Sequence, residues 1–297
     1  MSRLVLMVWF LAGAVQLLQA QLRRFYELNE PETYDTVDFT LKATSGISFV
    51  RHVDGGNPLN IFGNPDLDHI NPSFHSEVNN NTCQVKLVLD EYRKSMVGDG
   101  LVFAMLGGKE EEEQNYWKFL INDQKIYNLN LNYGIGSSDI DLSGTAVNKL
   151  KITTGNADVK VNYSSAAPNQ IEMDTFMVKV DLGSLEAHHI DRARAQNLVA
   201  EIGFGQGLLD FRNTLSTACN VYATVGAGRL NIILPKSEPV IIHMKESPLC
   251  NISMPRSLEQ VEKNVYVNMD YDSAAENLLT IYVDVAMGAV SFEESQD

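Results

Sequence analysis

The feature that most constrains the fold of this chain is a recurring run of alternating apolar residues that breaks at a glycine and then resumes. In one copy Leu129, Leu131 and Tyr133 alternate with polar residues up to Gly134. Apolar residues at every second position indicate a half-buried strand, and recurrence at similar intervals indicates a repeat in which each unit covers the next. Further copies lie at residues 150–161, 178–185, 198–211, 221–235 and 281–292.

The glycines of this repeat indicate the kind of unit. A tight corner often requires a positive φ angle, which glycine adopts without steric cost, and glycine also lets strand backbones approach closely. A unit of about 20 residues with short strands and turns is the size of one turn of a parallel β-solenoid. We expect a small-residue insertion to form a loop at residues 164–169. The pivotal glycines are Gly136, Gly155, Gly183, Gly205 and Gly228.

We therefore predict an all-β chain built on a right-handed parallel β-solenoid. The alternative is an antiparallel sandwich, which usually carries hairpin signals, and the one near match, Asp99-Gly100, lies outside the repeat. One helix is expected at residues 257–263, because Ser257 and Gln260 complete a capping box. The predicted organisation is a signal peptide (1–20), an irregular β-rich cap with long loops and a strand at 101–106 (21–128), the solenoid (129–292) and a tail (293–297).

The first 20 residues have the features of a secretory signal peptide. Arg3 precedes an apolar stretch at residues 4–18, and we expect cleavage after the small residue Ala20. The competing cleavage site, at residues 12–14, would leave a very short apolar region. A membrane anchor is the alternative, but the stretch is shorter than the roughly 20 residues that span a bilayer. The sequence thus predicts a secreted, periplasmic or envelope protein that is not an integral membrane protein.

The formal charge of -15 limits the partners of the chain. The predicted signal peptide holds one base and no acid, so its removal makes the charge -16. Nucleic acids and anionic membranes repel such a polyanion. We therefore expect no nucleic-acid partner, whereas cations, basic surfaces and glycans stay compatible with the charge.

The three cysteines, Cys83, Cys219 and Cys250, are too few for a disulfide-dense secreted scaffold. One of them must stay unpaired within a monomer. Cys219 and Cys250 could form a bridge if their rungs stack on each other. The alternative is that they are free, since free cysteine is among the most buried residue types.

Two segments carry a family resemblance. Residues 225–235, VGAGRLNIILP, resemble the Gly-x-Gly-x-x-x-Ile-x-Leu-Pro signature of the C-terminal domain of LiaF-like cell-wall-active antibiotic response proteins. Residues 271–290 resemble that family's ending, where an Asn-x-Leu step precedes a strand that closes on Gly288 and Val290. The toast-rack and adhesin-like families are similar in the same way.

The resemblance covers residues 129–292 and implies a β-solenoid fold. It brings no catalytic residues and no cofactor, so we expect neither. Members that act in membrane signalling carry N-terminal transmembrane helices, whereas this chain begins with a signal-peptide pattern and about a hundred further residues. The resemblance therefore implies little about mechanism.

Four acidic residues follow the pivotal glycines and are the candidate metal ligands. If they stack on successive rungs, they form an acidic stripe that could hold Ca²⁺ through oxygen ligands, or place carboxylates for glycoside chemistry. The alternative is that they are ordinary outward-facing polar residues of a solenoid. The four residues are Asp139, Asp141, Asp158 and Asp210.

Trp117 is the candidate glycan-binding residue, because it lies in an aromatic cluster with Tyr116 and Phe119 that could stack on a sugar. Packing between the N-terminal region and the first rung explains the cluster as well, since aromatic residues dominate core burial. Tyr127 and Tyr133 follow downstream.

The sequence best fits a secreted, non-enzymatic β-solenoid of the bacterial envelope with a structural, adhesion-like or stress-response role. Its partner would be an envelope protein or a glycan. The alternative function is a carbohydrate-binding protein, or a lyase or hydrolase, that uses the acidic face or the region of Trp117. No catalytic motif stands out in the sequence, so this functional prediction rests on the predicted fold and on the predicted location outside the cytoplasm.

Overall fold

The computed structural model describes residues 24–28, 34–65, 70–91, 116–245 and 247–295. The predicted signal peptide and the predicted strand at residues 101–106 lie outside these ranges. Within them the regular structure is β-strand, apart from one short 3-10 helix, η2 (Ile190–Ala193). No helix of the described residues is long and apolar enough to cross a bilayer.

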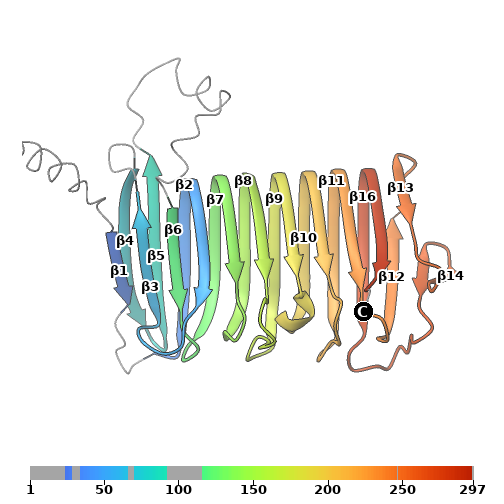
Figure 1. The fold of residues 1–297 in the computed structure, drawn as a ribbon, viewed down its shortest axis with the longest axis horizontal. Coiled ribbons are helices and arrows are strands. Elements are labelled where there is room, and N and C mark those ends of the chain that lie inside the picture. The colour runs from blue at the N-terminus through green and yellow to red at the C-terminus, as the bar shows by residue number, and fades with distance from the viewer. Residues whose placement is uncertain (1–23, 29–33, 66–69, 92–115, 246, 296–297) are drawn as a thin grey trace, which may run out of the picture.

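A row of long strands, each of 16 or 17 residues, forms the body of the molecule. Neighbours in the row pair in parallel, and each strand folds over at one edge of the molecule, while loops join successive strands at the opposite edge (Figure 1). We call each long strand a rung and its halves before and after the bend the first arm and the second arm. In order, the rungs are β2 (Thr36–His52), β7 (Ile126–Asp141), β8 (Val147–Asn162), β9 (Met173–His188), β10 (Ala195–Asp210), β11 (Cys219–Leu234) and β16 (Leu279–Glu294).

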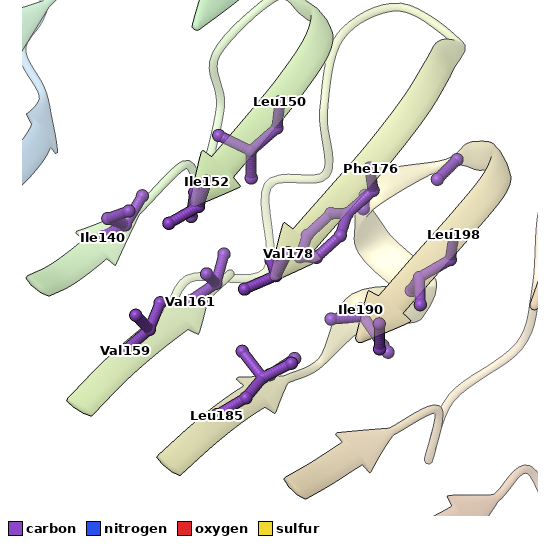
Figure 2. Packing of buried hydrophobic residues seen from close by; sticks show 14 of the residues in the cluster. Ile140, Leu150, Ile152, Val159, Val161, Phe176, Val178, Leu185, Ile190 and Leu198 are labelled. Atoms are coloured by element: carbon purple, nitrogen blue, oxygen red, sulfur yellow. The ribbon is translucent and has the colours of Figure 1, made fainter. Parts of the chain in front are cut away.

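The core lies between the two arms of the rungs. Alternate residues are buried in each arm, as the period of two predicts. In β8, Leu150 and Ile152 of the first arm and Val159 and Val161 of the second arm all point into a common interior (Figure 2). The expected all-β parallel solenoid is confirmed, in the form of an open stack of bent strands whose two layers of arms enclose the core.

Glycine forms the bend of nearly every rung. A Cβ atom on Gly205 would overlap the carbonyl oxygen of Gly183 in the rung before, at a distance that real Cβ atoms do not show. The same overlap recurs at Gly228 with the oxygen of Gly205. The backbones of successive corners therefore lie in direct contact. The carbonyl group of one corner fills the space in which the next corner would place a side chain. The corner glycines with positive φ are Gly46, Gly136, Gly183, Gly205, Gly228 and Gly288, which share one column of the register.

The corner of β8 differs from the prediction. Ala157, and not Gly155, aligns with Gly136 and Gly183. Ala157 is not among the residues of positive φ, so this rung turns without the glycine conformation. Gly155 lies two residues earlier, where its Cβ position is blocked by the carbonyl oxygen of Gly134.

On the N-terminal side, separate strands continue both layers of arms. The first arm of β2 pairs with β5 (Thr82–Glu91), and its second arm pairs with β6 (Tyr116–Ile121). Antiparallel strands extend each layer: β4 (Ile70–Asn79) lies beside β5, while β3 (Leu59–Asn64) and then β1 (Arg24–Leu28) follow β6. Because β2 is already a complete rung, the stack begins at Thr36, well before the expected start at Leu129.

The C-terminal side ends in the same way. The first arm of β16 pairs with β12 (Val240–Lys245), and its second arm pairs with β13 (Cys250–Ser253). Beyond β12 lie β15 (Val265–Val267) and β14 (Glu259–Glu262), both antiparallel.

The helix predicted at residues 257–263 is wrong, because this segment contains β14. Leu258, just before the strand, packs against the core, and β14 pairs with β15. Asn264 has a left-handed φ of 62°, which reverses the chain between the two strands. Tertiary pairing thus overrides the local capping-box signal.

Replacing Gly205 by alanine tests the corner. The new Cβ would collide with the backbone of Gly183, so we expect the free energy of unfolding to fall by about 3 kcal/mol or more. Gly56→Ala is the matched control, because Gly56 also has a positive φ but has open space around its Cβ position. Its cost should be only about 1–2 kcal/mol. Urea denaturation measures both, and equal costs would contradict a stacked corner.

Candidate functional site

The four candidate carboxylates do not form the acidic stripe that the sequence suggested. Asp139 aligns with Lys160, and Asp158 with Ser137 and Ser184, so these two carboxylates occupy different columns. Asp141 aligns with Asn162, which in turn aligns with His188 of β9. Asp210 follows Leu209, the partner of Ala187, so it continues this last column two rungs beyond Asn162.

Two of these carboxylates pair with arginine. Arg51 donates to Asp139 with an Nη2–Oδ2 distance of 2.9 Å. The side chain of Asp210 is fully buried and accepts the Nε–H of Arg212 at 2.8 Å. A buried carboxylate needs such a partner, since an unpaired buried charge is costly. Both contacts are those of structural ion pairs.

The other two candidate carboxylates, Asp158 and Asp141, accept hydrogen bonds from serine hydroxyls. The exposed Asp158 accepts the hydroxyl of Ser184 at 2.6 Å. Asp141 accepts the hydroxyl and the backbone N–H of Ser143, at 2.7 and 3.0 Å, and the hydroxyl of Ser164. Partial burial raises the pKa of Asp141, but the hydrogen bonds from Ser164 and Ser143 outweigh this effect and hold its pKa below the usual value.

These contacts bear on the expected metal site. In the part of the chain that the structure describes, no three His, Cys, Asp or Glu side chains are placed to hold a metal ion. Asp139 and Asp158 lie in separate columns, whereas Asp141 and Asp210 share a column but lie three rungs apart. In addition, a neighbouring side chain holds each of Asp139, Asp141 and Asp210. Calcium binding stays a prediction from the sequence.

Trp117, the candidate sugar-stacking residue, is buried and only 2% exposed. Its ring covers the backbone of Gly63 in β3, where a Cβ atom would overlap the ring. Phe119 in the same strand packs against Phe39 of β2, with ring centroids 5.3 Å apart. The packing interpretation therefore explains the aromatic cluster, and Trp117 offers no surface to a sugar.

The three cysteines are free. Cys219 aligns with Leu279 at the start of β16, whereas Cys250 aligns with Gly288 at its corner, so the two do not stack and the bridge considered between them is not formed. Burial raises the pKa of Cys219 to about 12. Such a thiol is unreactive at neutral pH and acts as a small core residue.

An aromatic cluster that sequence reasoning missed lies on the outer face of the first arms at the C-terminal end. The rings of Tyr222 in β11 and Tyr282 in β16 stack with centroids 5.1 Å apart and an interplanar angle of 6°. His243 of β12 stacks on the other face of Tyr282 at 4.7 Å and 11°. Each ring follows the same local signal, an aromatic residue between two inward-facing apolar ones. We call these three residues the ring ladder.

A groove of about 340 Å³ runs beside the ring ladder. A larger hollow of about 770 Å³ lies near the ends of β11 and β16, where its lining mixes Arg212 and Lys236 with Glu293 and Glu294. The lining of that larger hollow contains neither histidine nor cysteine. It therefore brings together charges of both signs without a histidine or a thiol.

Large apolar side chains also lie exposed along the bent edge. They occupy the position just before the corner glycine in four of the rungs and align in one column, in which Asn156 of β8 and Ala227 of β11 stand between them. Their narrow row follows from the corner geometry, because a residue at the outside of a bend faces solvent. They are Ile135, Leu182, Phe204 and Met287, which are 60%, 49%, 62% and 52% exposed.

Part of the chain is similar to a described protein family. A family model described as the N-terminal domain of toast_rack, DUF2154, matches residues 68–183. The toast-rack resemblance seen in the repeat is thereby confirmed, although the match begins earlier than Leu129 and ends within β9.

No curated protein matches the chain at a significant level. Among solved structures, a "putative cell adhesion protein" from Clostridium sporogenes ATCC 15579 aligns with 92% of this chain and 99% of its own, at 14% sequence identity and a TM-score of 0.45.

The pH dependence of stability tests the environment of Asp141. Because its folded pKa is lowered, Asp141 contributes stability that is present above the unfolded pKa of about 3.9 and is lost as the pH falls through the folded value. Ser164→Ala should cost about 1 kcal/mol at pH 7, and this cost should shrink toward pH 2. Ser247→Ala is the control, because Ser247 donates to the carbonyl of Ala286 and its cost should not vary with pH. A constant cost for Ser164→Ala in denaturant titrations would contradict the assignment.

Proposed function

We propose that this protein is a secreted, non-enzymatic scaffold of the bacterial cell envelope that presents a rigid face to another macromolecule. The observation that carries the proposal is the in-register parallel stack of rungs from β2 to β16. Stacked repeats create extended surfaces that bind partners without a deep pocket. A role in adhesion or in the response to envelope stress fits such a surface.

The contacts of the carboxylates support a non-enzymatic role. Glycoside hydrolysis needs two carboxyl groups that flank one bond, with one free to donate a proton and the other free to attack or to activate water. Here Arg51 holds Asp139, the two serines hold Asp141, and Arg212 holds Asp210. These three carboxyl groups are therefore committed to contacts within the fold.

Charge narrows the class of partner. At -15 the chain repels polyanions, so a basic protein surface or a neutral glycan is favoured over nucleic acid. The ring ladder favours the glycan among these, since it combines apolar rings with polar groups on an exposed sheet face.

Cell fractionation with N-terminal sequencing tests the location. We expect the protein in the envelope or the medium, with Gln21 as its first residue, because Ala20 fits the cleavage position. Ala20→Lys should block processing, whereas Ala14→Leu, the control, removes a small residue of the competing site, keeps the apolar stretch and should be processed normally. Unprocessed wild-type protein that starts at Met1 in the cytosol would refute secretion.

A further inference from the structure

We propose that the groove beside the ring ladder binds a neutral saccharide. The groove crosses the first arms of β11, β16 and β12, and its volume of about 340 Å³ lies at the small end of the range of small-molecule sites. Its lining residues are Tyr222, Ala223, Thr224, His243, Met244, Lys245, Tyr282, Val283 and Asp284. This proposal rests on the proposed function in one respect, namely that the scaffold has a glycan as its partner.

One wall of the groove is the ring ladder. Tyr222 and Tyr282 are 45% and 39% exposed, although they stack on each other, so their outer edges and hydroxyls reach solvent. Among the described residues no side chain or backbone group hydrogen-bonds to either hydroxyl. Sugar rings carry C–H groups that pack on apolar aromatic surface, and the phenol and imidazole groups can exchange hydrogen bonds with sugar hydroxyls.

The opposite wall is polar. Two residues further along each strand, Thr224, Asp284 and Lys245 align in the next outward column. The Lys245 ammonium lies 2.6 Å from a carboxylate oxygen of Asp284, and the lysine side chain is 75% exposed. This pair offers acceptors and donors side by side, which suits a ligand whose hydroxyls both donate and accept. An apolar wall that faces a polar wall matches the two kinds of surface of a pyranose ring.

The floor of the groove excludes a peptide strand. Ala223, Val283 and Met244 are buried and point inward, so they present only backbone to the groove. That backbone is already paired, since β16 lies between β11 and β12 in register. A peptide that adds to a sheet needs an open edge, which this place lacks. The charge of the chain disfavours anionic ligands, so a neutral saccharide is the class that fits.

Calorimetric titration of the purified full chain with chitotriose and with cellotriose tests the proposal. The two probes differ in their N-acetyl groups, so they separate recognition of an amino sugar from recognition of a plain glucan. We expect at least one probe to bind at submillimolar to millimolar concentration. Tyr222→Ser combined with Tyr282→Ser should weaken that binding at least tenfold, and Asp284→Asn should weaken it while it leaves the rings in place.

Tyr271→Ser is the matched control, because Tyr271 lies in the loop between β15 and β16 and does not line the groove. Circular dichroism of each variant checks that the fold is retained. Binding that is unchanged in the double tyrosine variant, or no binding of either probe, would overturn the proposal. Neither result would bear on secretion, which is measured separately by fractionation.

Discussion

The close approach of corner backbones is the constraint on which the rest of this structure depends. Except at Ala157, the carbonyl oxygen of one corner occupies the space that a side chain of the next corner would need, so glycine is required at Gly205, Gly228 and Gly288. Because the bends coincide, the two arms on either side of them are held in register over the whole rung. The arms then face each other across a thin interior, and alternate residues of both arms fill it. The fold is thus a consequence of where the chain can bend.

The same register decides what the surface can do. Residues at equivalent positions line up across rungs, so a repeated residue type becomes a continuous feature, as with the ring ladder. The apolar residues at the bent edge share a column too, but Asn156 and Ala227 interrupt it. Asp139 and Asp158 each lie three residues after a glycine, Gly136 and Gly155, but these two glycines do not align with each other. The two aspartates therefore lie in separate columns. Columns that are filled by stacked rings create grooves between them, and this is the type of site that a scaffold without a deep pocket can offer.

Much of the fold is predictable from the sequence, because a period of two and a glycine break are local signals. The strands around Leu129, the parallel stacking and the role of Gly205 follow from them. Two findings are not local. The pivot at Ala157 depends on its neighbours Gly136 and Gly183, and the ring ladder depends on β12 pairing with β16 across a long separation in sequence. Spacing along the chain carries no information on register, so it suggests an acidic stripe that the aligned columns do not form. An aromatic cluster in the sequence fits a sugar platform and a packed core equally, and the burial of Trp117 shows that it belongs to the core.

Pulsed electron paramagnetic resonance between spin labels at the bent edge tests the stacked-rung account most directly. With the native cysteines replaced by serine, one label at Ser45 would be paired with a second at Phe204 or at Met287, which lie four and six rungs along the column. Strands about 4.8 Å apart predict separations of about 19 and 29 Å. Two separations that are equal, or that run in the opposite order, would contradict the account.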